Sequence, residues 1–547
     1  MKRYIPALVL VALASAAFAA GPAGTQPPTL AQQFAASQVR PGSALERLIR
    51  QNQDFSVLRP EELRDNLGIP LWLRVYWRAN HPEATYSADD PTGGYPRVLH
   101  EVHEWMMSHQ NLRRGPGDED REPEIGKAGA GPNVRTSGAQ TSPRSESAIS
   151  INPYGASNYV IASSNNISAG GAQAMFYSND GGSTWGQTYL PFTGRDTSHS
   201  DPTADWTSDG LAWSATIGIK GGTLAMRMYK STNNGTTWTF DNTFSGSQKN
   251  TDKEMIWIDH SASSPYRNNI YAIWHNSNPA YMNRRTASGW GTPIKVSGSE
   301  TSGTAIGGDV KTNAYGDVFG FWPATGNSKI VLVKSTTGGA SYGAAKAIAT
   351  TYDSYDIGVP SFASRRALIY VAGGAYRTAT KNLVYATWTD LSGETGCTAP
   401  ANEPGTNAAS TCKTRIWFSR SADGGTTWSA PVKLNNPAAK NDQFNQWLAV
   451  DETNGTIGVM YYDTIDDAAR LKTNVYYQVS TDDGATWSAP LKVTSAMTDE
   501  TVSGANSGNQ YGDYNGLSGY LNRFLPSWTD RRSNAKEEIW TAPISNP

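Results

Sequence analysis

Several short apolar segments of this chain are preceded by acidic, basic or phenolic residues, which are the side chains that acid–base chemistry uses. These residues are Asp201, Asp252, Lys253, Glu254, Asp309, Asp442, Asp513 and Tyr514. Cleavage of a glycosidic bond needs a carboxyl acid together with a carboxylate or a tyrosine as nucleophile or base. A tyrosine needs a base beside it, because its unperturbed pKa is about 10. The alternative is structural, since Asp-Pro and Gly-Asp are common turn dipeptides.

The apolar segments that follow these polar residues have the length and alternation of β-strands. We call the polar residues before each segment its polar corner. The segments occupy residues 146–151, 201–206, 252–259, 308–311, 358–362, 445–451 and 512–517. A second apolar run, often ending in an aromatic and then a polar residue, follows at 271–275, 385–390, 459–463 and 524–530. Short strands that recur with turn signals between them indicate an all-β domain. The polar corners would then lie where the first strand of each unit begins.

An octapeptide of the pattern S-x-D-x-G-x-T-W recurs after a further apolar run. Its five copies, some of them degenerate, span residues 178–185, 231–238, 335–342, 421–428 and 480–487. The Asp or Asn side chain can accept hydrogen bonds from N–H groups of its own turn, and the glycine supplies a position with positive φ. The tryptophan can fold back over the turn. Each copy is therefore predicted to be a self-stabilised β-hairpin with a structural role.

These repeats resemble the Asp boxes of sialidases (the bacterial neuraminidase, or BNR, repeat) and of related β-propellers. The resemblance covers the chain from about residue 132 to its end. It implies a sialidase-like β-propeller that binds, or hydrolyses, an extracellular glycan or glycoprotein. On this resemblance Tyr514 is the nucleophile, Glu254 is its base and Asp201 is the acid/base, with Asp513 beside them.

The candidates for substrate contacts are cationic and aromatic residues near the same corners. They are Lys253, Arg195, Arg531 and Trp257, with Arg365, Arg366, Arg532, Trp206 and Trp447 as further members. Sialidases that resemble this chain hold the substrate carboxylate with three arginines, the first in a [FY]-R-I-P motif before the first Asp box. Residues 142–147 read S-P-R-S-E-S and lack that motif. The second hypothesis is therefore a non-catalytic propeller that binds carbohydrate or protein.

The spacing of the repeats predicts the number of blades. The interval between the second and third copies is about twice the first, and a degenerate hairpin at 285–290 fills it. Residues 537–544 form a last strand-like run, and residues 133–136 can supply the missing fourth strand of the last unit and close the ring. We therefore predict an all-β fold with seven four-stranded blades. Six blades and one irregular unit are the alternative.

The termini and the cysteines predict the compartment. Residues 1–19 have a basic start, an apolar run and an A-F-A end, as in a secretory signal peptide. Cys397 and Cys412 lie in an insertion of the fifth unit and are expected to pair after export. A formal net charge of -2 gives no nucleic-acid or membrane footprint. We expect a secreted or periplasmic monomer with no membrane span and no cofactor, and a structural calcium ion is left open.

A small N-terminal segment is predicted to precede the propeller. The expected order is a linker at 20–42, a helical segment at 43–112, a second linker at 113–131 and the propeller at 132–547. Within the helical segment, His100, Glu101, His103 and Glu104 suggest a metal site. Because the histidines are three residues apart, the H-E-x-x-H pattern is absent, and a solvated helix face is the favoured interpretation.

Overall fold

The computed structural model describes residues 29–36, 42–59, 70–82 and 128–546, with gaps at 155–157, 169, 195, 299–304, 406–409 and 534–535, and the single residues 39, 63, 105, 109 and 112. The chain divides into one unit of residues 1–129 with 545–547 and another of residues 130–544. The predicted signal peptide, the His100–Glu104 motif and Arg195 lie outside the described residues.

The first unit is built from short helices, α2 (Leu30–Ala36), α3 (Ala44–Gln51), the 3-10 helix η1 (Phe55–Val57) and α4 (Leu71–Asn80). Ser43 caps α3 by accepting a hydrogen bond from the Glu46 N–H. Apolar residues of α3 and α4, such as Ile49 and Trp72, form a buried cluster against which Leu30 and Phe34 pack. Among the described residues, α2 thus lies inside the range 20–42 that the sequence suggested as a linker.

The second unit contains seven antiparallel sheets that form the blades, and a separate two-stranded sheet. Blade one is β3 (Arg144–Ile151), β4 (Val160–Asn166), β5 (Ala174–Ser178) and β6 (Gly186–Tyr189). Blade two is β7 (Ser198–Trp206), β8 (Ala212–Lys220), β9 (Thr223–Ser231) and β10 (Thr239–Thr243). Blade three is β11 (Thr251–Ile258), β12 (Ile270–Asn276), β13 (Ala280–Thr286), β14 (Gly289–Trp290) and β15 (Ile294–Lys295). Blade four is β16 (Asp309–Thr312), β17 (Val318–Ala324), β18 (Lys329–Ser335) and β19 (Lys346–Thr350), with η6 (Thr325–Asn327).

The remaining blades carry the additions to the repeat. The hairpin β20 (Asp356–Ile357) and β21 (Ala367–Leu368) precedes blade five, which is β22 (Val371–Arg377), β23 (Asn382–Leu391), β24 (Thr414–Ser421) and β25 (Val432–Lys433). Blade six is β26 (Gln443–Val450), β27 (Ile457–Asp463), β28 (Lys472–Ser480), β29 (Leu491–Lys492) and β30 (Thr498–Asp499). Blade seven is β31 (Gly516–Tyr520), β32 (Arg523–Asp530), β33 (Glu538–Thr541) and β2 (Val134–Arg135), extended by β1 (Gly129–Ala130) and β34 (Ile544–Ser545).

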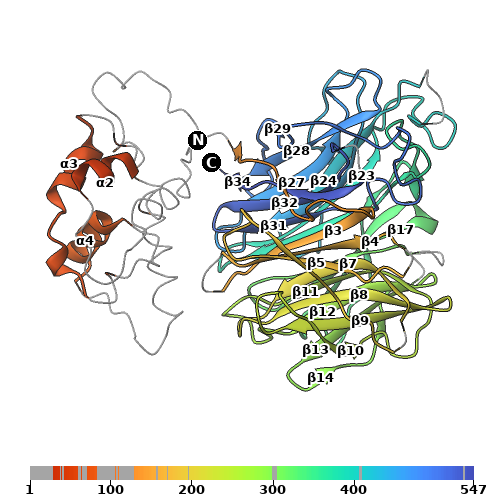
Figure 1. Ribbon diagram of the computed structural model, residues 1–547, viewed down its shortest axis with the longest axis horizontal. Coiled ribbons are helices and arrows are strands. Elements are labelled where there is room, and N and C mark those ends of the chain that lie inside the picture. Colours follow the sequence, from red (N-terminus) through yellow and green to blue (C-terminus); the bar gives the residue numbers. More distant parts are fainter. Residues whose placement is uncertain are drawn as a thin grey trace. The chain divides into compact units, whose positions relative to one another are not determined.

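The blades close into a ring through their first strands. Contacts run from β3 to β7, β11, β16, β22, β26, β31 and back to β3, and Figure 1 shows β3, β7 and β11 near one another within the propeller unit. The ring is completed by β2, which pairs with β33 through Val134↔Thr541 and Arg135↔Trp540. This confirms the predicted seven blades and the predicted fourth strand from residues 133–136.

One predicted inner strand is wrong. Residues 358–362 lie in the loop of the β20–β21 hairpin, and the inner strand of blade five is Val371–Arg377. The segment 358–362 contains Pro360, which has no N–H for a sheet ladder. The true strand contains Gly373 and Gly374, whose lack of side chains hid the apolar alternation.

The octapeptide repeats form the predicted hairpins, because a shared set of hydrogen bonds stabilises each turn. In the copy at 421–428, Ser421 Oγ accepts from the Gly425 N–H at 2.8 Å, and Asp423 Oδ1 accepts from the N–H groups of Thr426 and Thr427 at 2.9 and 2.8 Å. Thr427 Oγ1 donates to Asp423 Oδ2 at 2.6 Å. These bonds hold the pKa of the Asp423 carboxyl below its usual value, although burial acts against them.

The copy at 335–342 departs from the repeat pattern and offers a test of this hairpin. Thr337 takes the aspartate position there and accepts one backbone bond, from the Ser341 N–H at 3.1 Å. We expect Thr337→Asp to raise the free energy of unfolding by about 1 kcal/mol, because a carboxylate can accept two backbone bonds and a hydroxyl bond. Urea unfolding measures the change. Asp423→Ala should lower stability by a similar amount, and an unchanged midpoint in both variants would contradict this account.

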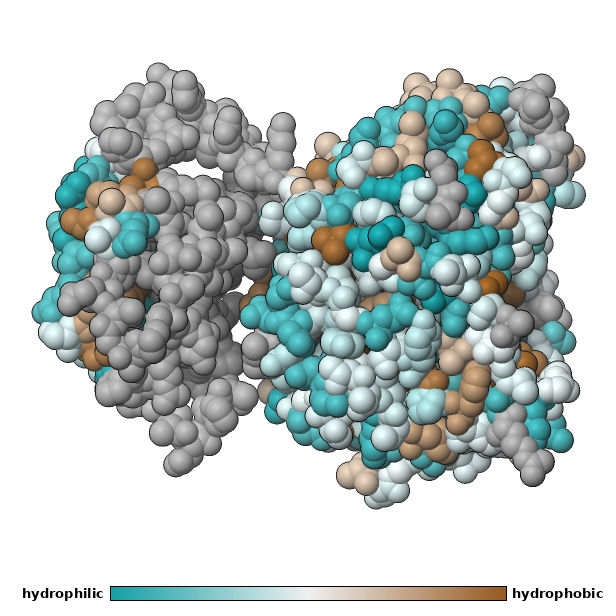
Figure 2. All heavy atoms as spheres, in the orientation of Figure 1, coloured by the Kyte–Doolittle hydropathy of each residue, from teal (hydrophilic) through white to brown (hydrophobic). Residues whose placement is uncertain are grey.

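The surface and the insertion add two observations. Figure 2 shows a mainly hydrophilic propeller face on which apolar residues form small separate patches. A disulfide joins Cys397 to Cys412 in the insertion between β23 and β24, as predicted. Among the helices of the described part of the chain, none has the length and apolarity needed to cross a bilayer.

Candidate functional site

A repeated backbone irregularity marks the beginning of four inner strands. In β3, β7, β11 and β26 the pairing register shifts after the first residues. The residues with positive φ at these shifts are Glu146 (54°), Asp201 (56°), Lys253 (57°) and Asn445 (48°). A non-glycine residue in this region costs about 1 kcal/mol or more, and such conformations are enriched at functional sites. The same local strain is therefore maintained in four blades.

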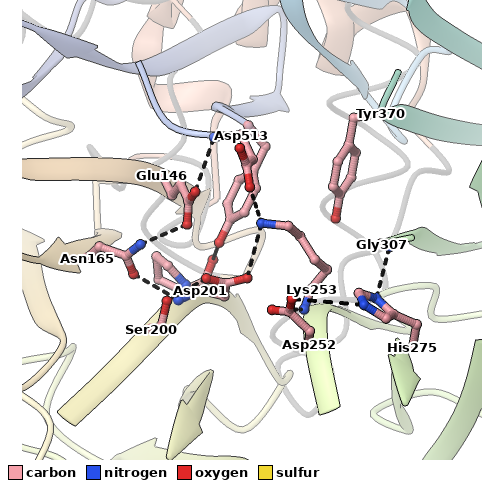
Figure 3. Close-up of polar contacts among 12 residues, drawn as sticks. Glu146, Asn165, Ser200, Asp201, Asp252, Lys253, His275, Gly307, Tyr370 and Asp513 are labelled. Carbon is pink, nitrogen blue, oxygen red and sulfur yellow. Dashed lines mark hydrogen bonds and ion pairs between the residues drawn. The ribbon is translucent and has the colours of Figure 1, made fainter. Parts of the chain in front are cut away.

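Three of these strained residues, Glu146, Asp201 and Lys253, lie around Asp513 in Figure 3. Together with Asp513 and Arg365 they form an ionic network that we call the central cluster. Lys253 pairs with Asp513 and lies 3.7 Å from Asp201 Oδ2. Arg365, from the loop between β20 and β21, pairs with Asp513 and lies 3.8 Å from Glu146 Oε1. The cluster thus joins blades one, two, three and seven.

Asn165 of β4 links Glu146 and Asp201, the two acidic residues at the register shifts of β3 and β7. Its Nδ2 donates to Glu146 Oε2 at 2.7 Å, and its Oδ1 accepts from the Asp201 N–H at 2.8 Å. The Asp513 N–H also donates to Glu146 Oε1, at 3.2 Å. Backbone and side-chain donors therefore fix the Glu146 carboxyl group in place, and Asn165 also holds the Asp201 backbone.

Burial and neighbouring charges separate the acidities of these groups. Burial raises the pKa of Glu146 to about 7, with Lys253 acting to lower it and Asp201 to raise it. Burial also acts to raise the pKa of Asp201, but Lys253 and the Ser200 hydroxyl outweigh it, and the pKa falls below its usual value. Asp201 is therefore ionised at neutral pH, whereas Glu146 titrates there.

Asp252 is the carboxyl group next to this cluster that keeps the most contact with solvent. Its side chain is 42% exposed, and its Oδ2 lies 3.9 Å from His275 Nε2. Partial burial, followed by the charge of Asp201, raises the pKa of Asp252 to about 6. His275 Nδ1 accepts from the Gly307 N–H at 3.1 Å, and burial lowers the pKa of the imidazole to about 4. Neutral His275 therefore carries its proton on Nε2, facing Asp252.

Tyr514 and Glu254 are both buried beside the central cluster. The Tyr514 hydroxyl donates to the Pro202 carbonyl at 3.3 Å, and its pKa is raised well above 10 by burial and then by Asp201 and Glu146. The Glu254 side chain is fully buried, and no described residue hydrogen-bonds to its carboxyl oxygens. Burial and then the charge of Asp201 raise its pKa well above the usual range. Burial therefore favours the protonated form of both groups.

Other residues singled out from the sequence make contacts of their own. The Lys311 ammonium lies 2.5 Å from Asp309 and 4.7 Å from the centre of the Trp257 ring. Asp442 pairs with buried Arg470 at 2.6 Å. Three further arginines singled out from the sequence lie beside carboxylates outside the central cluster: Arg366 pairs with Glu403, Arg531 lies 4.0 Å from Glu537 and Arg532 pairs with Asp530. The side chains of Trp206 and Trp447 are buried.

The structure thus brings Asp201, Lys253, Asp513, Tyr514 and Glu254 into one region, and it adds Glu146 and Arg365. Glu146 opens the strand 146–151 at the same place as Asp201 in its own strand, so the repeat contained a usable signal. Arg365 stands in no recognisable pattern. In the described residues, no group of three or more His, Cys, Asp or Glu side chains is arranged to hold a metal ion.

Comparisons with known proteins leave the family open. No protein-family model and no curated protein matches the chain. Among solved structures, the BP39L lectin from Burkholderia pseudomallei is 12% identical over 73% of this chain and 96% of its own, with a TM-score of 0.45. The leech intramolecular trans-sialidase is 11% identical over 68% and 73%, with a TM-score of 0.43. The α-L-arabinofuranosidase Arb93A from Fusarium graminearum is 10% identical over 65% and 95%, with a TM-score of 0.39. Scores in this range fix no activity for this chain.

Proposed function

We propose that this protein is an exported propeller that binds a glycan at the central cluster and hydrolyses a glycosidic bond. The observation that carries the proposal is the pair of Asp252 and Asp201, whose acidities are shifted in opposite directions beside four strained strand beginnings. Neighbouring titratable groups with divergent pKa values are the usual basis of acid and base roles. The sialidase-like repeats support a sugar as the substrate, and the disulfide supports export.

In this proposal Asp252 is the general acid. It reaches solvent, and a carboxyl group with a pKa of about 6 is protonated in mildly acidic medium. It would protonate the leaving oxygen of the glycoside. Ionised Asp201 would act as the base for water or oppose the positive charge that develops on the sugar ring. Lys253 would hold Asp201 in its charged form, and Asp513 would hold Lys253 in position.

The charges of the cluster favour an uncharged sugar over sialic acid. Recognition of a sialic acid carboxylate by bidentate contacts needs free guanidinium groups. Arg365 faces the cluster, but its guanidinium already pairs with Asp513, and Lys253 lies between Asp513 and Asp201. An exo-sialidase remains the specific reading of the Asp-box resemblance, and a sialoside belongs in the test.

A binding propeller without catalysis is the second candidate. It is favoured by the environment of Tyr514, because a buried phenol that donates to a backbone carbonyl and has a raised pKa is a poor nucleophile. The role of Tyr514 as nucleophile stays a prediction. Tyr514→Phe tests it directly, because the variant keeps the ring and removes the hydroxyl.

We expect Asp252→Asn to lower kcat about a hundredfold on any glycoside that the wild-type protein hydrolyses, because general acid catalysis typically contributes at least that factor. The wild-type kcat should fall as pH rises through about 6, since Asp252 loses its proton there. A panel of fluorogenic glycosides, including a sialoside, measured from pH 4 to 8, provides both readouts.

The matched control is Asp483→Asn, in the hairpin between β28 and β29. That hairpin lies at the opposite end of its blade from the beginning of β26, because β28 runs parallel to β26. Asp483→Asn should leave kcat unchanged. Turnover that survives Asp252→Asn would remove the acid assignment, and the absence of turnover on the whole panel would favour the binding propeller.

A further inference from the structure

An exposed aromatic residue lies next to the candidate site on the β20–β21 hairpin. Tyr355 is 40% exposed, and its carbonyl accepts from the Ile369 N–H at 2.9 Å, which continues the Asp356↔Leu368 pairing. Tyr370, which follows Ile369 in the chain, lies across Lys253 from Asp201 and Asp513 in Figure 3. The hairpin therefore presents Tyr355 at the border of the charged site.

The loop of the same hairpin supplies Arg365 to the central cluster. Gln510 Oε1 accepts from the N–H groups of Ser364 and Arg365, at 3.2 and 2.9 Å. Arg365 Nη1 donates to the Gly508 carbonyl at 3.2 Å, and the Arg365 side chain is 24% exposed. One short hairpin thus carries an exposed aromatic ring and a partly exposed arginine side chain.

The insertion closed by the disulfide anchors this hairpin. Glu403 is fully buried and accepts from both terminal nitrogens of Arg366, at 2.8 and 2.7 Å, and from the Gly358 N–H at 2.9 Å. Arg366 Nε also donates to Asp356 Oδ1 at 2.7 Å. The disulfide confines the segment that contains Glu403. Tyr355 is consequently presented on a braced backbone, which reduces the entropy lost on binding.

The electrostatic surroundings of Tyr355 agree with its place beside the site. Its phenol pKa is raised by partial burial and then by Asp356, and the charges of Lys253, Asp252 and Arg365 also act on the hydroxyl. The ring is therefore within electrostatic reach of the groups that would contact a ligand.

We propose that Tyr355 is a stacking surface for a sugar ring of an uncharged oligosaccharide, with Asp252 and Arg365 bonding to hydroxyl groups of the same ligand. A sugar ring has an apolar face and a rim of hydroxyl groups, and these match an exposed aromatic ring beside a carboxylate and a guanidinium. The inference rests on the proposed glycan site and adds the ligand class and a binding residue. It requires binding but not hydrolysis.

The test is titration calorimetry of the full-length protein with neutral hexasaccharides of xylose, glucose, mannose and arabinose units, and with 3′-sialyllactose. We expect at least one neutral hexasaccharide to bind, and Tyr355→Ala to weaken that binding about tenfold, as the loss of an aromatic contact would. Tyr355→Phe should bind within about twofold of wild type, because the ring is retained.

Tyr315→Ala is the matched control. Tyr315 is 47% exposed and lies in the turn between β16 and β17, at the opposite end of the strands from the central cluster. This variant should bind like wild type. Failure of every neutral hexasaccharide to bind at millimolar concentration, or equal affinity of Tyr355→Ala and wild type, would overturn the inference. Binding that depends on Tyr355 without any turnover would support it while removing the hydrolase proposal, and turnover with an unchanged KM in Tyr355→Ala would do the reverse.

Discussion

Lys253→Met is expected to lower the free energy of unfolding by about 3–5 kcal/mol, because it leaves the buried Asp201 carboxylate without its cation and Asp513 with Arg365 alone. The Lys253 side chain is 9% exposed, and its partners Asp201 and Asp513 are 5% and 4% exposed. Burial acts to lower the pKa of the ammonium, but Asp201 and Glu146 outweigh it and raise the pKa above its usual value. Urea unfolding at neutral pH measures the loss.

Two comparisons separate this effect from a general loss of packing. Lys492→Met removes a lysine that is 48% exposed and pairs with Asp466, so its cost should stay below about 1 kcal/mol. The double variant Lys253→Met/Asp513→Asn also removes one of the two carboxylates that Lys253 neutralised, and it should recover part of the stability. If the double variant were as unstable as the sum of both single variants, the ion pair would not be the cause.

His260 lies at the other end of the inner strands from the central cluster. His260→Gln is expected to lower the free energy of unfolding by about 3 kcal/mol at pH 6. His260 follows β11, and its Nε2 lies 3.0 Å from Asp205 of β7, while its Nδ1 lies 2.9 Å from Glu452, which follows β26. Burial acts to lower the imidazole pKa, but Asp205 and then Glu452 raise it to about 10. A charged imidazole therefore links blades two, three and six, and its removal leaves two carboxylates without their cationic partner.

The pH dependence gives this prediction its sign. Since the folded pKa lies above the unfolded value of about 6.5, the stabilisation is complete below pH 6.5 and is lost as pH rises through about 10. The stability gap between wild type and His260→Gln should therefore narrow between pH 7 and 10.5 in urea unfolding. His199→Gln is the control, because burial lowers the His199 pKa to about 4 and leaves it neutral over this range. A His260 gap that is as flat as the His199 gap would contradict the charged link.

The repeat made the architecture predictable because its hydrogen bonds are local. Each octapeptide supplies hydrogen-bond acceptors for the N–H groups of its own turn, as Ser421 and Asp423 do. Its residues therefore specify a hairpin without contacts to distant residues. The spacing of such hairpins then implies seven blades. The inner strand of blade five was missed because Gly373 and Gly374 carry no apolar side chains, whereas the apolar run at 358–362 belongs to a loop.

The site was only partly predictable, because its members come from segments far apart in the chain. Asp201 and Lys253 were recognisable as polar residues at strand beginnings, and Glu146 occupies the equivalent place in blade one. The partnership of Arg365 with Asp513 spans 148 residues and has no local signature. The burial of Tyr514 and its raised pKa likewise depend on residues of other blades.

The sequence by itself determined the hairpins, the number of blades, the closing strand and the disulfide, since each depends on short-range pattern or on chain spacing. Tertiary structure alone decided which charges meet, which remain open to solvent and which are held neutral. The physical reason is that a pKa and an ion pair depend on the groups within a few ångströms in space. In a closed ring of blades, those groups belong to different repeats.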